Sequence, residues 1–335
     1  MLFTICSNNY LDKALVLIQS LREQGYENPM VCIADEGNDD VKTRLNAANI
    51  HYFYLSDLSL PYESLIDNKY NITELNTAIK PAVFKYLYEK YQPASITYLD
   101  PDIWVASPLE ELETLVNDYD IILTPHMCSP VDDGLAPSDF NVLPGGVFNL
   151  GYITLGKYER VKSFLDWWEH RTVNYGHGDQ SRGMFYDQLW MNYVPAMWER
   201  YYILKHPGYN MANWNLHERV LTKDDQGRFL VNHELPLRFF HFSGYNYQKP
   251  DVICKYANRY NFDNRPDLKE IFDLYQRELI KNEIVFYSSL TPAYGKLKKE
   301  AIETRTIKRN LFSRLLSRIT NTIYFLVSGK LKNYS

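Results

Sequence analysis

Short apolar segments alternate with amphipathic ones over the first part of the chain. Residues 2–6, 30–34 and 51–55 are apolar and end in polar residues, which is typical of buried strands. Between them, residues 10–24 and 41–48 place apolar side chains at helical spacing, and a glycine follows the first of these segments. This order predicts an α/β fold with a mixed, mostly parallel sheet that is flanked by helices.

The same alternation continues toward the carboxyl end. Further strands are predicted at residues 95–105, 120–124, 147–155 and 237–242. Further helices are predicted at residues 73–91, where Pro81 is expected to cause a break, and at 109–116, 159–175 and 266–281. Residues 128–146 are rich in Pro, Asp and Gly without periodicity and predict an irregular, mobile loop over the site.

Composition narrows the class of protein. The 335 residues are 45 % hydrophobic and 23 % charged, which is ordinary for a globular protein, and the net charge of −5 argues against a nucleic-acid partner. The chain has no apolar run of about 18 residues, and its start lacks a basic signal region, so a cytoplasmic location is expected. The cysteines have no metal-binding spacing and fit a reducing compartment; they are Cys6, Cys32, Cys128 and Cys254.

The last forty residues differ in charge from the rest. Residues 296–335 contain ten basic and two acidic side chains, a net charge of +8, so the preceding residues carry −13. Within this tail, apolar residues recur every four positions, at Leu311, Leu315, Ile319 and Ile323. A basic amphipathic helix predicts peripheral contact with an anionic membrane surface. The alternative is a terminal helix that packs on the body with its basic face in water.

Two carboxylates follow the apolar part of the 95–105 strand. Asp100 and Asp102 flank Pro101, and residues i and i+2 of an extended segment point the same way. Paired carboxylates suit Mg²⁺ or Mn²⁺, which complete their shells with phosphate oxygens. The alternative is ordinary turn chemistry at a strand end. No G-x-G-x-x-G or P-loop motif is present.

Four motifs occur in the order expected for one enzyme class. They are Asp100-Pro-Asp102, Phe148-Asn149-Leu150-Gly151, Asp187-Gln188, and His241-Phe-Ser-Gly244 followed by Lys249-Pro250. In this order the chain resembles nucleotide-sugar glycosyltransferases of the GT-A fold, most closely the retaining family 8 group of galactosyltransferases and glycogenin. The resemblance implies a catalytic domain at residues 1–250, with a donor half to about 125 and an acceptor half from about 126. A helical extension at 251–295 and the basic tail at 296–335 would follow.

The resemblance also implies roles for single residues. Asp100, Asp102 and His241 would hold Mn²⁺ (or Mg²⁺) against the diphosphate of a nucleotide-diphosphate sugar, a UDP-hexose being favoured, and the sugar would go to a glycan, glycolipid or glycoprotein acceptor. Asp187 and Gln188 would be catalytic. Donor contacts would come from Thr4, Ser7, Asn8, Asp35, Lys80, Gly244 and Lys249. Asn149 and Gly151 would lie near the donor sugar.

A further segment predicts substrate contacts from its composition alone. Residues 206–219 combine hydrogen-bonding side chains with an aromatic ring, as a sugar pocket requires. The candidates there are Asn210, Asn213, Trp214 and His217.

The sequence is also compatible with three different functions. Four residues separate Gly244 from Lys249, and Asp251 stands where the family has Trp, so an inverting enzyme is the first of these. Inversion needs a general base, for which the candidates are Asp187, His217 and Glu218. The second is a non-catalytic sugar-nucleotide-binding protein. The third is a haloacid-dehalogenase-type phosphatase, although Trp104 does not fit its motif.

Single residues also have simpler interpretations. Ser7, Asn8 and Asp35 could cap strand ends, and Asp187 could cap a helix. His241 in an apolar strand could be a core residue, and Lys249 a solvated lysine.

Overall fold

The computed structural model describes residues 1–60 and 69–295 of the chain. The predicted basic tail, with its apolar positions from Leu311 to Ile323, lies outside these residues. Within the described ranges, no helix is long and apolar enough to cross a membrane.

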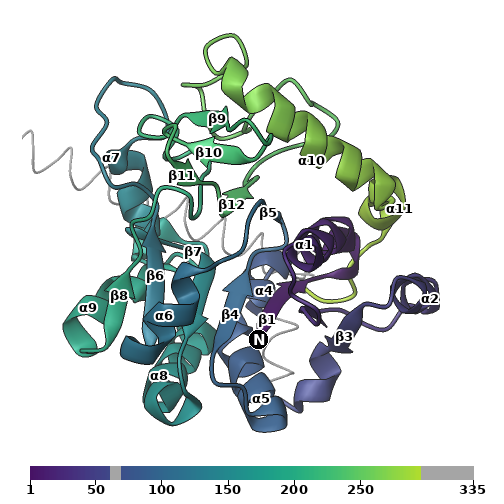
Figure 1. The fold of residues 1–335 in the computed structure, drawn as a ribbon. Coiled ribbons are helices and arrows are strands. Elements are labelled where there is room, and N and C mark those ends of the chain that lie inside the picture. The colour runs from purple at the N-terminus through teal and green to yellow at the C-terminus, as the bar shows by residue number, and fades with distance from the viewer. Residues whose placement is uncertain (61–68, 296–335) are drawn as a thin grey trace, which may run out of the picture.

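A seven-stranded sheet forms the centre of the molecule (Figure 1). Its strands in spatial order are β3 (His51–Tyr54), β2 (Met30–Ile33), β1 (Leu2–Cys6), β4 (Ile96–Leu99), β7 (Phe148–Leu155), β6 (Ile121–Pro125) and β8 (Tyr201–Ile203). β7 runs antiparallel to both neighbours, and every other adjacent pair in this sheet is parallel. The predicted α/β fold with a mostly parallel sheet is therefore confirmed.

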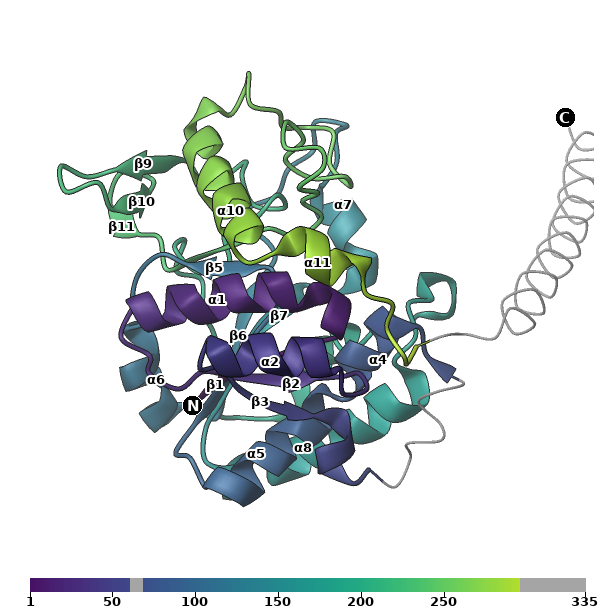
Figure 2. The same cartoon turned by 90° about the vertical axis from the view of Figure 1, so that its right-hand side faces the viewer.

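Helices cover both faces of the sheet, as Figure 2 shows edge-on. One layer contains α1 (Leu11–Glu23) and α2 (Asp39–Ala47), and the other contains α4 (Ile72–Ala78), α5 (Lys80–Tyr91) and α8 (Tyr158–Tyr175). Alternate residues of one strand enter different cores: Cys32 packs with the α5 and α8 side, whereas Val31 and Ile33 pack with α1. Both faces of these strands are buried, so the strands read as unbroken apolar runs.

Polar caps and a proline set the helix boundaries. The Asn38 side chain accepts a hydrogen bond from the Val41 amide at the start of α2, and Asn71 forms a capping box with Glu74 at the start of α4. The break that was expected near Pro81 is present, because α4 ends at Ala78 and α5 begins at Lys80. Pro81 lies in the first turn of α5, where no amide hydrogen is needed.

A second layer of structure covers the other side of α1. The short strand β5 (Ile103–Val105) leaves the main sheet and pairs with β12 (Phe239–His241). A three-stranded sheet follows nearby, made of β9 (Leu221–Lys223), β10 (Phe229–Val231) and β11 (Leu235–Pro236). α6 (Glu111–Asp118) connects β5 to β6.

The predicted helical extension consists of α10 (Lys269–Lys281) and α11 (Ile284–Ser289), and both helices pack against α1. Val16 of α1 joins the same apolar cluster as Phe272 and Leu279 of α10. α1 is thus covered from several sides, which explains why its apolar residues are not confined to one stripe. The predicted domain boundaries near residues 125 and 250 stay predictions.

The predicted irregular loop, residues 128–146, contains only short helical turns, α7 (Asp139–Val142) and a 3-10 turn at Leu143–Gly145. Arg259 anchors it by donating to the Asp133 carboxylate at 2.7 and 2.8 Å and to the Leu135 carbonyl at 2.8 Å. Asn258 accepts from the Ala136 amide at 2.7 Å. The loop is therefore tied to the segment that precedes α10.

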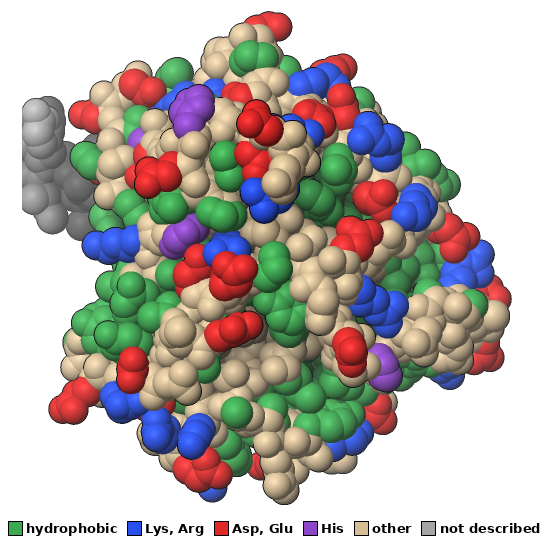
Figure 3. All heavy atoms as spheres, in the orientation of Figure 1, with side chains coloured by type: hydrophobic (Ala, Val, Ile, Leu, Met, Phe, Trp, Pro, Cys, Tyr) green, Lys and Arg blue, Asp and Glu red, His purple; other side chains and the backbone are tan. Residues whose placement is uncertain are grey.

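The face seen in Figure 3 carries acidic, basic and apolar side chains intermingled, with a group of apolar side chains over β8 and α9 (Val194–Met197). Tyr193 and Met197 are half exposed there, and Tyr193 packs edge-on against Trp167. This group lies on the rim of the sheet, beyond β6.

Candidate metal and substrate site

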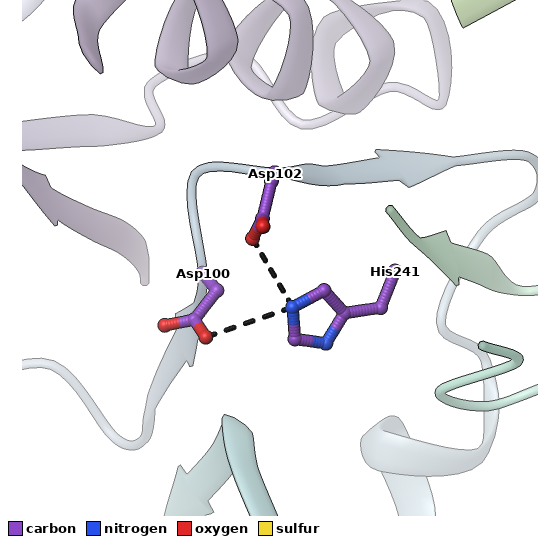
Figure 4. A group of neighbouring side chains, drawn as sticks. All are labelled: Asp100, Asp102 and His241. Carbon is purple, nitrogen blue, oxygen red and sulfur yellow. Dashed lines mark ion pairs between the residues drawn. The ribbon is translucent and has the colours of Figure 1, made fainter. Parts of the chain in front are cut away.

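Three potential metal ligands converge between the main sheet and the β5–β12 pair (Figure 4). His241 Nε2 lies 3.1 Å from Asp102 Oδ1 and 3.7 Å from Asp100 Oδ2. One ligand atom from each residue falls within 4.8 Å of the others, and the described part of the chain contains no second group of three such side chains. The two carboxylates suit Mn²⁺ or Mg²⁺, and the imidazole nitrogen favours Mn²⁺ of the two.

The backbone brings the two acids together by a turn. The Ile103 amide donates to the Asp100 carbonyl at 3.2 Å, so β4 ends at Leu99 and the chain turns away from the sheet before β5 (Figure 4). The expectation of one extended segment through Asp100 and Asp102 was therefore wrong, although both carboxylates do face one point. Pairing of Ile103 with His241 across β5 and β12 then delivers the imidazole to the same place.

Asn210 fixes the orientation of the imidazole. Its Nδ2 donates to Thr124 Oγ1 and Asn149 Oδ1, both at 3.1 Å, so its Oδ1 faces His241 Nδ1 at 3.3 Å. His241 Nδ1 therefore carries a proton, and Nε2, which faces the acids, is the nitrogen that would bind a metal ion after losing its own proton. Trp214 packs edge-on against the imidazole, with ring centroids 5.1 Å apart.

The electrostatics of the cluster leave an excess of negative charge. Burial raises the pKa of Asp100, and the Lys80 ammonium offsets part of that rise. Burial alone would raise the pKa of Asp102 and lower that of His241, but the contact between the two outweighs it, lowering the first pKa and raising the second. With Asp187 included, three carboxylates lie around the Lys80 ammonium and the His241 imidazole, and a divalent cation would relieve the repulsion between the acids when the imidazole is neutral.

Lys80 and Asp187 form a buried ion pair beside the cluster. Their charged atoms lie 2.6 Å apart, and both side chains are almost fully buried. Lys80 also donates to the Leu150 carbonyl at 2.9 Å and lies 4.0 Å from the centre of the Tyr98 ring. The simpler interpretation of Asp187 as a helix cap was wrong, because its carboxylate pairs with Lys80 and Gln188 occupies the position before the next 3-10 helix.

Gln188 and Asn149 organise the start of β7. Gln188 Oε1 accepts from the Leu150 amide at 2.9 Å, and its Nε2 donates to the Gly145 carbonyl at 2.8 Å. Asn149 Nδ2 faces Gln188 Oε1 and His126 Nε2, each at 3.3 Å. The catalytic roles of Asp187 and Gln188 and the sugar contact of Asn149 stay predictions.

Gly151 allows His241 to approach β7. A Cβ atom at this position would lie 2.4 Å from His241 Cε1, 2.8 Å from His241 Nδ1 and 2.9 Å from Asn149 Oδ1. The backbone there does not need positive φ, so steric space alone requires glycine.

Gly151→Ala is therefore expected to displace the imidazole and lower Mn²⁺ affinity about 10- to 100-fold. Quenching of Trp214 fluorescence during a Mn²⁺ titration would measure the change. Gly37→Ala is the matched control, because its methyl group would meet mainly the flexible end of Lys42. Unchanged affinity in Gly151→Ala would contradict the assignment of His241 as a ligand.

Asp35 and Ser7, two of the residues expected to contact the donor, are hydrogen-bonded to neighbouring residues. Asp35 Oδ2 accepts from the Asn8 amide at 3.1 Å, and its Oδ1 accepts from the Glu36 and Ala293 amides at 2.9 and 2.7 Å. Ser7 donates to Asn9 at 2.6 Å. These bonds match the capping interpretation. Nucleotide contacts by them, and by the buried Thr4 on β1, stay predictions.

The other residues expected to contact donor or substrate lie in different surroundings. Gly244 has φ +76°, and a Cβ atom would lie 2.8 Å from Cys254 Sγ, so glycine is required there. Lys249 is exposed in the turn that follows. Asn213 donates to the Ser243 carbonyl at 3.2 Å, and His217 Nε2 faces the Ser129 carbonyl at 3.0 Å. The last two side chains thus hold loops.

Sequence reasoning missed several residues near the cluster. A cavity of about 230 Å³ beside Asp102 is lined also by Tyr10, Lys13 and Lys255. Both lysines could face a diphosphate; Lys13 is placed there by the packing of α1 against β5, and Lys255 by the turns that follow β12. His126 was also missed, because its position depends on contacts with Asn149 and Trp214.

No protein-family model matches the chain. Two uncharacterized proteins of Bacillus subtilis (strain 168) are similar to it. YfnF is 23 % identical over 303 residues, 87 % of this chain and 95 % of that one, and YfnD is 24 % identical over 278 residues, 80 % and 85 %.

Solved structures of glycosyltransferases, the class that the motifs resemble, are also similar to the chain. Galactosyltransferase LgtC in complex with donor and acceptor sugar analogs is 14 % identical, with a TM-score of 0.46, over 87 % of this chain and 97 % of LgtC. Apo mouse xyloside xylosyltransferase 1 is 14 % identical, with a TM-score of 0.44, over 72 % and 96 %.

Proposed function

We propose that the chain is a metal-dependent glycosyltransferase that moves a hexosyl group from a nucleotide-diphosphate sugar, with UDP as the favoured nucleotide, to a saccharide acceptor. The observation that carries the proposal is the convergence of Asp100, Asp102 and His241 on one point at the carboxyl end of the sheet, because open α/β sheets bind ligands at this edge.

A metal ion bound by Asp100, Asp102 and His241 would be suited to bind the diphosphate of the donor. When bound, Mn²⁺ or Mg²⁺ would supply positive charge to the diphosphate as it leaves the sugar. Asp100 and Asp102 would neutralise the cation, and Asn210 would keep His241 Nε2 free to bind it. Lys13 and Lys255, on the cavity beside Asp102, would add charge near the leaving group.

Retention of the anomeric configuration is part of the proposal. Each candidate general base is already engaged: Asp187 pairs with Lys80, and Glu218 accepts from Ser129 Oγ at 2.6 Å. His217 faces the same serine. Because these three side chains already have hydrogen-bond or ion-pair partners, none of them is free to act as the general base that inversion requires.

Release of nucleotide from a panel of nucleotide-diphosphate hexoses would test the function. We expect turnover with Mn²⁺, a fall of about 100-fold or more in EDTA, and recovery when Mn²⁺ is restored. Full turnover in EDTA would contradict the metal role. Binding of donor without any nucleotide release, with or without added acceptor sugars, would indicate a non-catalytic sugar-nucleotide-binding protein.

A further inference from the structure

Tyr98, at the end of β4, donates a hydrogen bond to one acid of the metal cluster. Its hydroxyl lies 2.5 Å from Asp100 Oδ1, and the residue is only 3 % exposed. A tyrosine hydroxyl keeps its proton at neutral pH, so Tyr98 is the donor and the carboxylate oxygen is the acceptor. The proposed function gives this buried contact no role.

The Tyr98 ring is held from two directions. Phe3 of β1 packs edge-on against it, with ring centroids 5.2 Å apart, and Lys80 Nζ lies 4.0 Å from the centre of the ring. Lys80 is itself fixed by its ion pair with Asp187 and by its hydrogen bond to the Leu150 carbonyl. The hydroxyl therefore has little freedom to move, as a group that positions a ligand requires.

The two oxygens of Asp100 have different surroundings. Oδ1 accepts from Tyr98, whereas Oδ2 lies 3.7 Å from His241 Nε2, and Figure 4 shows the other oxygen pointing away from the imidazole. The Asp100 amide also donates to the Gly151 carbonyl at 2.8 Å, which anchors the backbone from which the carboxylate projects. Turning the carboxylate would break its bond with Tyr98. Asp100 thus offers one oxygen, Oδ2, to the point that it shares with Asp102 and His241.

The number of oxygens that a carboxylate offers influences which cation it binds. Mn²⁺ and Mg²⁺ favour octahedral shells, whereas Ca²⁺ is larger, accepts more ligands and often takes both oxygens of one carboxylate. A carboxylate that supplies a single oxygen also leaves more of an octahedral shell open to the phosphate oxygens of a substrate.

We propose that Tyr98 is a positioning residue that sets the metal preference of the cluster. By holding Oδ1 of Asp100, it limits this acid to one ligand oxygen and thereby favours Mn²⁺ over Ca²⁺. The inference rests on the proposed function, because it concerns the metal ion of the same site.

Titrations of Mn²⁺ and of Ca²⁺ into the full chain, followed by calorimetry, test the proposal with Tyr98→Phe. This change removes the hydroxyl and keeps the ring that packs with Phe3 and Lys80. We expect Mn²⁺ affinity to fall about 10- to 100-fold and Ca²⁺ affinity to change by less than about threefold, because the released carboxylate can give Ca²⁺ both oxygens. General damage to the site would weaken both ions alike. An equal ratio of Mn²⁺ to Ca²⁺ affinity in Tyr98→Phe and wild type would overturn the proposal.

Tyr152→Phe is the matched control. Tyr152 on β7 is also fully buried, and its hydroxyl accepts from Thr154 Oγ1 at 2.9 Å. Its ring lies in a different apolar cluster from that of Tyr98, together with Tyr209 and Phe239. This variant loses a buried hydrogen bond as well, but it should bind both ions as the wild type does. A fall in the Mn²⁺-to-Ca²⁺ ratio as large as that in Tyr98→Phe would contradict the assignment.

Nucleotide release distinguishes this inference from the proposed function. At saturating Mn²⁺, release by Tyr98→Phe should approach that of the wild type, because the hydroxyl acts on a metal ligand. Full release in EDTA by the wild-type chain, or no Mn²⁺ binding by it, would contradict the proposed function. Normal Mn²⁺ binding and release in the wild type, with an unchanged ion preference in Tyr98→Phe, would contradict only the role of Tyr98.

Discussion

Asp102→Asn is expected to lower nucleotide release by about 1,000-fold or more, equivalent to ~4 kcal/mol of transition-state stabilisation. Asp102 Oδ1 lies 3.1 Å from His241 Nε2, so this carboxylate has the closest contact with the imidazole in the cluster. An amide of the same size keeps the shape but removes a charged ligand that a divalent cation prefers. The expected result is a loss of both Mn²⁺ binding and turnover.

Three measurements make this prediction specific. Calorimetry with Mn²⁺ reports binding, nucleotide release reports turnover, and a thermal melt reports folding. Asp225→Asn is the matched control, because this acid is exposed in the turn between β9 and β10. Normal turnover in Asp102→Asn, with the fold intact, would rule out a metal role for the carboxylate.

Lys80→Met is expected to lower the free energy of unfolding by about 3–5 kcal/mol. Lys80 is buried against Asp187 at 2.6 Å and also donates to the Leu150 carbonyl. Methionine fills a similar volume, but it leaves a buried carboxylate without its cation and a buried carbonyl without its donor. Asp100 also loses a compensating charge, because Lys80 counters the rise in its pKa.

Two further variants identify the cause of this loss. Lys80→Met combined with Asp187→Asn should regain a large part of the stability, because the unpaired charge is removed. Lys85→Met is the matched control on the same helix: Lys85 pairs with Asp166 and Glu169 near the surface, and its loss should change stability by about 1 kcal/mol or less. Chemical denaturation measures all three. If Lys80→Met and Lys85→Met lowered the free energy of unfolding by similar amounts, the buried Lys80–Asp187 pair would contribute no more to stability than the surface pairs of Lys85.

The order of strands and helices was predictable because it depends on local patterns. β1 and β2 are buried on both faces, so they appear as apolar runs between polar ends. The turn at Asp100 was not predictable in this way. The chain turns away from the main sheet there and β5 pairs with β12, a partner that lies far away in the sequence. Local spacing contains no information about such a pairing.

The candidate site was predictable to the extent that motifs mark it. Asp100, Asp102 and His241 were named from motif order, and the structure brings them together. His126 and Lys13 carry no motif, and their importance comes from the side chains that pack around them. The expected substrate contacts of Asn213 and His217 rested on composition alone. The structure gives both side chains loop partners, which composition does not reveal.

The register between β7 and β6 limits how this protein can vary in length. Asn149 and Gly151 are two residues apart on one strand, so they share a face, and Thr124 of β6 lies beside Asn149 in the register. Deleting or inserting a single residue in β7 would move both relative to Thr124, next to the point where the register between β6 and β7 already shifts, between Leu123 and Thr124. A point substitution removes one contact at a time. An insertion or deletion in β7 would displace Asn149 and Gly151 from His241 together.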